Sequence, residues 1–165
     1  MSFIGIISNT KSEKIINNIL KNKLEKDKNI IIINEKNIIN MKNIKFETIL
    51  IANSNKVVKE YKKALENIIV NTKYLILNAD IAIDLEIEKE NELSVITYGF
   101  NSKATITASS VEENVLLCIQ RKIIDINNRQ IEQQEIKISV FDNMEISTND
   151  IIAVATILLL YGKII

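Results

Sequence analysis

Four short aliphatic runs, separated by polar or helix-periodic segments, constrain the fold of this 165-residue chain most strongly. They lie at residues 3–7, 30–33, 48–52 and 74–77. Each run is short and continuously apolar, which is typical of a strand buried on both faces of a sheet. Between them, residues 12–24 and 57–69 repeat apolar side chains at helical spacing. Strands that alternate with helices predict an α/β fold with a mostly parallel sheet flanked by helices over residues 1–80.

Polar residues predict where the helices begin and where a loop lies within residues 1–80. Ser12 is predicted to cap the first helix, because its side-chain oxygen can accept a free backbone N–H group. Residues 34–45 are polar and irregular and predict a loop. The second helix is expected to begin within residues 53–55.

The pattern changes after residue 80. Residues 92–142 contain short runs that predict a small antiparallel sheet, and Asn127-Asn128 has the turn chemistry of a hairpin. The predicted strands are 95–98, 105–108, 115–121, 122–126 and 135–141. A last apolar helix is predicted over residues 149–162, with Gly162 as its stop. No linker-like segment separates the halves, so residues 1–165 are predicted to form one domain.

Composition excludes several classes of function. Lys plus Arg and Asp plus Glu both number 21, so the basic excess of a general nucleic-acid binder is missing. The longest apolar stretch, residues 151–161, falls far short of the ~20 residues that span a bilayer. No signal peptide is recognisable, and a cytoplasmic protein without a membrane span is expected.

Few residues offer catalytic or metal chemistry. The chain has no histidine, which excludes Ser-His-Asp and Cys-His arrangements. Its one cysteine, Cys118, lies in an apolar run and is predicted to be buried filler. The acidic residues that alternate through 84–92 are predicted to form a solvated face rather than a cation site.

Four segments resemble, in order, the central ATPase domain of the Mur ligases and folylpolyglutamate synthases. The first is residues 4–12, which stand where the family has its phosphate loop. The second is Tyr61 to Leu65 together with Asn78-Ala79-Asp80, and the third is Tyr98-Gly99 with the strand after it. The fourth is the helix from Asn149. The resemblance implies a P-loop-like fold, and it covers most of the chain. The family's N-terminal substrate domain and C-terminal domain have no counterpart here, so a shortened, standalone form with newly exposed surfaces is expected.

The family's chemistry is only partly present. Lys11-Ser12 matches the end of the phosphate loop, but no glycine occurs between Gly5 and Gly99 to let consecutive N–H groups cradle a phosphate. Leu65 stands where the family has a modified lysine that holds magnesium. No catalytic residue, metal ligand or cofactor is therefore predicted.

Two functions follow as expectations. The first is a non-catalytic, Mur-ligase-like binding, scaffold or regulatory module with a protein partner or self-association, linked through the family to cell-envelope or spore processes. The alternative is a nucleotide-binding protein or weak ATPase that takes ATP and magnesium through Lys11, Ser12, Asn78 and Asp80. Tyr98-Gly99 is expected to keep a turn geometry rather than a ligand contact.

Overall fold

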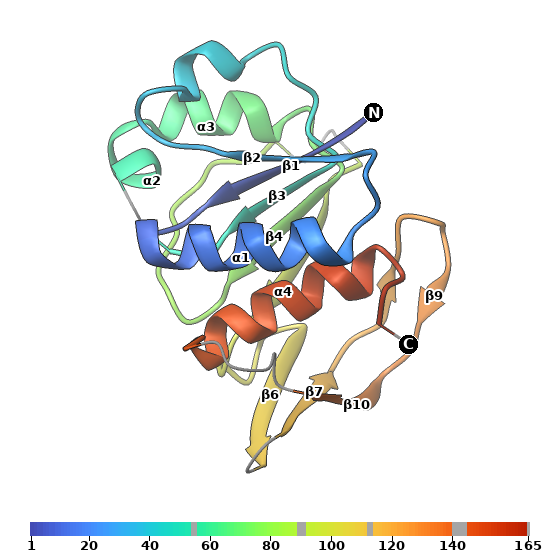
Figure 1. The fold of residues 1–165 in the computed structure, drawn as a ribbon. Coiled ribbons are helices and arrows are strands. Elements are labelled where there is room, and N and C mark those ends of the chain that lie inside the picture. Colours follow the sequence, from blue (N-terminus) through green and yellow to red (C-terminus); the bar gives the residue numbers. More distant parts are fainter. Residues whose placement is uncertain (54–55, 89–91, 112–113, 140–144, 165) are drawn as a thin grey trace.

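A computed structural model describes residues 1–53, 56–88, 92–111, 114–139 and 145–164, and Figure 1 shows the arrangement of its elements. The helices are α1 (Thr10–Lys23), η1 (a 3-10 turn, Ile38–Met41), α2 (Lys56–Glu60), α3 (Lys62–Ile69) and α4 (Thr148–Leu160). The strands are β1 (Ser2–Ile7), β2 (Lys28–Ile32), β3 (Thr48–Ile51), β4 (Tyr74–Asn78), β5 (Ser94–Tyr98), β6 (Ile106–Val111), β7 (Asn114–Ile119), β8 (Ile123–Ile124), β9 (Gln130–Ile131) and β10 (Gln134–Ser139).

Eight strands form one sheet in the order β10-β7-β6-β5-β4-β3-β1-β2. The neighbours from β2 to β6 pair in parallel, whereas β6, β7 and β10 pair antiparallel. The mostly parallel α/β sheet predicted from the aliphatic runs is confirmed. Two details differ. The strand predicted at residues 95–98 in the antiparallel part is β5, which pairs in parallel with β4 and β6. The strands β6, β7 and β10 extend the large sheet, and the separate antiparallel sheet is the small β8–β9 hairpin.

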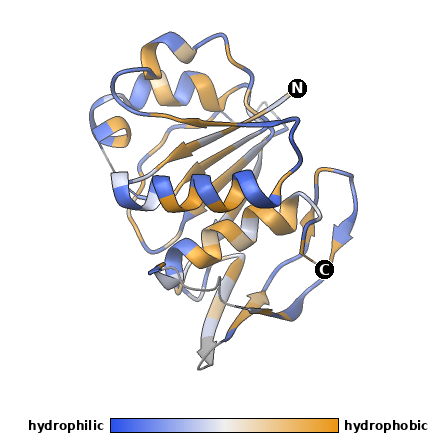
Figure 2. Cartoon of the chain, in the orientation of Figure 1, coloured by the Kyte–Doolittle hydropathy of each residue, from blue (hydrophilic) through white to orange (hydrophobic). Residues whose placement is uncertain are grey.

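Two hydrophobic layers cover the sheet because successive residues of a strand point to opposite faces. Ile6 and Leu50 face the layer that contains α1 and α4, and Ile7 and Ile49 face the layer of η1, α2 and α3. Figure 1 shows α1 and α4 side by side on one face. In Figure 2, α4 is apolar along most of its length, while α1 is polar on its outer side. The helix α4 is therefore the central element of its layer.

The second layer does not reach the antiparallel strands. Alternate side chains of β6, β7 and β10 on that face are partly or fully exposed, including Thr107, Cys118 and Lys137. The prediction that Cys118 is buried is therefore wrong, because its side of β7 carries no helix. Cys118 is half-buried; this partial burial first, and then nearby Glu135, raise the pKa of its thiol, so it is not an activated thiolate.

Several local predictions are confirmed or corrected. The hairpin at Asn127-Asn128 is confirmed, with Asn128 in the left-handed region at φ 60°, and Gly162 follows the end of α4 at φ 67°. Residues 34–45 contain the turn η1 and are not wholly irregular. The second helix is divided at Tyr61 into α2 and α3; its predicted start partly falls on residues 54–55, outside the described residues.

The acidic stretch is solvated, as predicted, where the structure describes it. Asp84, Glu86 and Glu88 are exposed, while the alternating Leu85 and Ile87 pack against the layer of α3. Residues 89–91 lie outside the described residues. Glu66 of α3 accepts a hydrogen bond from the backbone N–H of Glu86 at 2.7 Å, which attaches this stretch to the helix.

Candidate ligand cavity at the carboxyl edge of the sheet

The parallel strands β1, β3, β4 and β5 end at one edge of the sheet, called here the carboxyl edge. From β1 the chain continues through α1 to β2 on one side, and then crosses to β3 on the other side. The strand order thus reverses between β1 and β3. Open α/β sheets bind ligands in the crevice at such a reversal, just beyond the carboxyl ends of the strands. A ligand-binding site is therefore expected at the carboxyl edge.

The connection from β1 to α1 is only two residues long and is closed by Asn9. Its side-chain oxygen accepts the backbone N–H of Ser12 at 2.9 Å, so Asn9 is the N-terminal cap and the prediction that Ser12 caps the helix is wrong. The backbone carbonyl of Asn9 also accepts the N–H of Glu13 at 2.9 Å. The bond of Glu13 is the first ordinary hydrogen bond of the helix, whereas Ser12 has one of the free N–H groups that a phosphate would use at a helix start, and this group is already bonded.

Ser12 has a different partner from the one that the family resemblance implies. Its hydroxyl donates to Oδ2 of Asp150 at 2.8 Å, and both residues are only 7% exposed. Asp150 lies in the first turn of α4, where its own N–H donates to the capping hydroxyl of Ser147 at 3.1 Å. The bond therefore joins the starts of α1 and α4, and it places a carboxylate beside the serine.

Asn78 and Asp80 brace the ends of the strands. The amide of Asn78 donates to the carbonyl of Ala52 at 3.1 Å, which links β4 to the end of β3. The two carboxylate oxygens of Asp80 accept the N–H groups of Phe100 and Asn101, each at 2.8 Å. Both predicted ligand residues thus hold the backbone at this edge.

Gly99 fits the same turn. It has φ 138°, and a Cβ atom there would lie 2.6 Å from Oδ2 of Asp80. A residue without a side chain is needed both for this backbone angle and for the close carboxylate. The predicted turn geometry of Tyr98-Gly99 is confirmed.

A cavity of about 260 Å³ opens at the carboxyl edge between the starts of α1 and α4. Three of the four predicted ligand residues, Lys11, Ser12 and Asn78, lie in its wall, and Asp80 does not. The other lining residues are Asn9, Ile15, Ala52, Asn53, Tyr98, Glu145, Ser147, Asn149 and Asp150. The sequence alone indicated Tyr98 only as part of a turn, and it gave no signal for Glu145, Asn149 or Asp150 as lining residues.

The described walls of this cavity carry more negative than positive charge. Lys11 is its one cation in the described part of the chain, and Glu145 and Asp150 are carboxylates. Buried Tyr98 lies beside them; burial first, and then Asp150 and Asp80, raise the pKa of its hydroxyl far above the ordinary value. Tyr98 is thus a neutral hydrogen-bonding group near neutral pH.

A second cavity, of about 350 Å³, lies beyond Asn9 at the same edge. Its charged residues are Glu13, Glu35, Lys36 and Lys56, so the two signs balance. Burial, with a smaller contribution from Glu35, raises the pKa of Glu13 despite the opposing effect of Lys14. Neither cavity offers the excess of positive charge that favours a phosphate.

Metal ligands do not gather anywhere in the described part of the chain, where no group of three or more Cys, Asp or Glu side chains could hold an ion. Within the same residues, no helix has both the length and the apolar character needed to cross a membrane. No protein-family model matches the chain, and no curated protein matches it.

Proposed function

We propose that this protein is a non-catalytic binding module, with a Mur-ligase-like framework, that acts as a scaffold or regulator through self-association or a protein partner. The observation that carries the proposal is the buried bond between Ser12 and Asp150. In the family that the sequence resembles, this serine would meet magnesium and phosphate. Here the hydroxyl of Ser12 donates a hydrogen bond to the carboxylate of Asp150. The negative charge of this carboxylate repels phosphate.

An exposed groove between β5 and β8 supports a binding role. Val95 and Ile124 are 48% and 41% exposed, and both line a groove of about 290 Å³ beside β5. Arg121 and Lys122 belong to the same groove. Exposed apolar side chains that converge on a concave surface favour an interface with another protein. The proposed link to cell-envelope or spore processes comes from the family resemblance alone.

Sedimentation equilibrium tests the self-association. The expected result is a concentration-dependent mass for the wild type that Val95→Asp reduces, since a charge in the groove opposes burial. Ile39→Asp is the matched control, because Ile39 is another exposed aliphatic residue, 64% exposed, on a different part of the surface. A wild type that stays monomeric at all concentrations would contradict self-association. If it also binds no nucleotide, a separate protein partner remains as the basis of the proposed scaffold or regulatory role.

The alternative proposal is a nucleotide-binding protein or weak ATPase. It is favoured by one observation, the presence of Lys11, Ser12 and Asn78 in the wall of one cavity. Calorimetric titration with ATP and ADP, with and without magnesium, separates the two proposals. Saturable micromolar binding that Lys11→Ala abolishes and the exposed control Lys14→Ala preserves would establish the nucleotide function. No binding at millimolar nucleotide is the result expected for the binding module.

A further inference from the structure

Two polar groups in the cavity at the carboxyl edge have no partner. Tyr98 is only 1% exposed, lines the cavity, and its hydroxyl makes no hydrogen bond with any residue that the structure describes. Oδ1 of Asn149 is buried in the same wall and is also without a partner there. Oδ1 of Asn149 has no surface open to the cavity, so the hydroxyl of Tyr98 is the unbonded group that a molecule in the cavity can reach. An unbonded hydroxyl on an otherwise buried side chain that lines a cavity points to a ligand or to ordered water.

The unbonded groups are mostly acceptors. Asp150 uses Oδ2 for Ser12 and leaves Oδ1 without a donor among the described residues. The exposed carboxylate of Glu145 is a second acceptor in the same wall. The neutral hydroxyl of Tyr98 can accept or donate. A complementary ligand therefore brings several N–H donors and a positive charge.

We propose that this cavity binds a primary ammonium group. Such a group has three N–H donors and one positive charge, which matches the carboxylates of Asp150 and Glu145 and the hydroxyl of Tyr98 in the cavity wall. Carboxylate acceptors strengthen these bonds because charge-assisted hydrogen bonds are about twice as strong as neutral ones.

Lys11 has a defined place in this proposal. It lines the cavity and makes no ion pair with any described residue, so its ammonium repels a cationic ligand and competes for the same carboxylates. Removing its charge strengthens the binding of an amine. A phosphate ligand predicts the opposite, since Lys11 would then be an attractive contact.

The proposal does not depend on the self-association or partner described above, because it concerns only the cavity. The ammonium can belong to a free small amine or to a lysine side chain of a peptide. Putrescine represents the first source and Nα-acetyl-lysine amide the second, with inorganic phosphate as the contrasting anion. Calorimetry or amide chemical shifts can follow each titration of the full chain.

The expected result is saturable binding of at least one amine and none of phosphate. Glu145→Gln should lower the affinity for the amine by about tenfold, because one charge-assisted hydrogen bond is lost. Lys11→Met should raise this affinity several-fold. Tyr98→Phe should lower the affinity by less than Glu145→Gln does. Glu132→Gln and Lys14→Met, both exposed and outside the cavity wall, are the matched controls and should change nothing.

Glu145 is exposed, so its neutral variant tests the site without threatening the fold. No saturable binding of either amine would overturn the proposal and leave ordered water as the partner of Tyr98. Weaker amine binding in Lys11→Met, or phosphate binding that Lys11→Met abolishes, would also overturn it. Amide shifts confined to the groove of Val95 would place the amine elsewhere and contradict it.

Discussion

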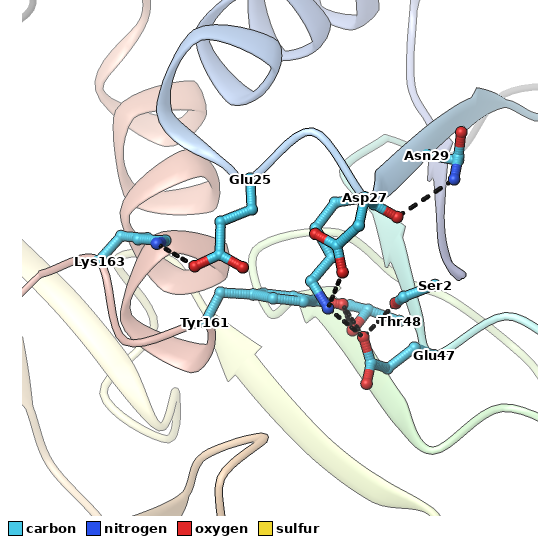
Figure 3. Close-up of polar contacts among 9 residues, drawn as sticks. Ser2, Glu25, Asp27, Asn29, Glu47, Thr48, Tyr161 and Lys163 are labelled. Carbon is cyan, nitrogen blue, oxygen red and sulfur yellow. Dashed lines mark hydrogen bonds and ion pairs between the residues drawn. The ribbon is translucent and has the colours of Figure 1, made fainter.

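Two buried tyrosines lie at opposite edges of the same sheet and differ in one respect. Tyr161, at the end of α4, donates to Oε2 of Glu47 at 2.9 Å and is bonded to the hydroxyl of Thr48 at 2.9 Å (Figure 3). The hydroxyl of Tyr98, at the carboxyl edge, has no hydrogen-bond partner among the described residues. Burial is the largest cause of a strongly raised pKa for both hydroxyls, so both stay neutral. The difference is therefore in their partners and not in their ionisation.

The polar groups around Tyr161 bond to one another. Glu47 also accepts the hydroxyl of Ser2, and the ammonium of Lys28 lies 3.8 Å from it and 5.4 Å from the centre of the Tyr161 ring. Figure 3 shows Ser2, Glu47 and Thr48, at or next to the starts of β1 and β3, close to Tyr161 at the end of α4. This edge holds the fold together, whereas the opposite edge keeps unbonded polar groups for a ligand.

The largest expected effect is at the β8–β9 hairpin, which lies at the same edge as Tyr161, because Tyr74 at the start of β4 donates to the backbone carbonyl of Asp125 at 3.0 Å. Asp125 is 1% exposed and accepts the N–H groups of Asn127 and Arg129, each at 2.8 Å, and the Arg129 side chain at 2.7 Å. Asp125→Ala should lower the free energy of unfolding by about 3 kcal/mol, because charge-assisted bonds are lost. Urea unfolding measures this, with exposed Glu132→Ala as a control that should cost little. An equal loss of unfolding free energy in Asp125→Ala and Glu132→Ala would contradict the stabilising role of the Asp125 hydrogen bonds.

The next effect tests the buried hydrogen bond between Ser12 and Asp150. Ser12→Ala removes the side-chain donor of buried Asp150 and should cost about 2 kcal/mol in urea unfolding. Ser109→Ala, at an exposed position of β6, is the matched control and should change stability by less than about 0.5 kcal/mol. A neutral Ser12→Ala would show that the serine is free for another partner, as the nucleotide proposal requires.

A smaller effect concerns pH. Burial opposes ionisation of Asp125, but the hydrogen bonds from Arg129 and Asn127 outweigh it and hold the pKa below the ordinary value of 3.8. A carboxyl group with a lowered folded-state pKa contributes stability above 3.8, and this is lost as pH falls through the folded-state value. The slope of unfolding free energy against pH should therefore be flatter in Asp125→Asn below pH 3.8. An unchanged slope would contradict this cause.

Local patterns predicted much of this fold because their physical cause lies within a few residues. All four aliphatic runs became strands, but only β1, β3 and β4 are mostly buried, because β2 is at the edge of the sheet and is partly exposed. Asn127-Asn128 closed a hairpin, and Gly162 ended the last helix. Other features depend on residues far apart in the chain. Ser12 meets Asp150 across 138 positions, and no local rule distinguishes it from Asn9 as a cap. The exposure of Cys118 depends on which face of β7 the helices leave open.

The candidate site was predictable only in part for the same reason. Lys11, Ser12 and Asn78 were found through their place in recognisable segments, and they do lie together. Asp80 was also conspicuous in the sequence, but its carboxylate is used by the turn after β5. The unbonded state of Tyr98 and Asn149 depends on every neighbour in three dimensions, so it has no signature in the sequence.

The two tyrosines provide the most direct test of the claim that one edge is structural and the other is for binding. Urea unfolding of Tyr161→Phe and Tyr98→Phe compares the loss of one hydroxyl at two buried positions. Tyr161→Phe should cost about 1–3 kcal/mol, because Thr48 and Glu47 lose a partner, and Tyr98→Phe should change stability by less than about 0.5 kcal/mol. Equal costs, or a larger cost for Tyr98→Phe, would contradict the account.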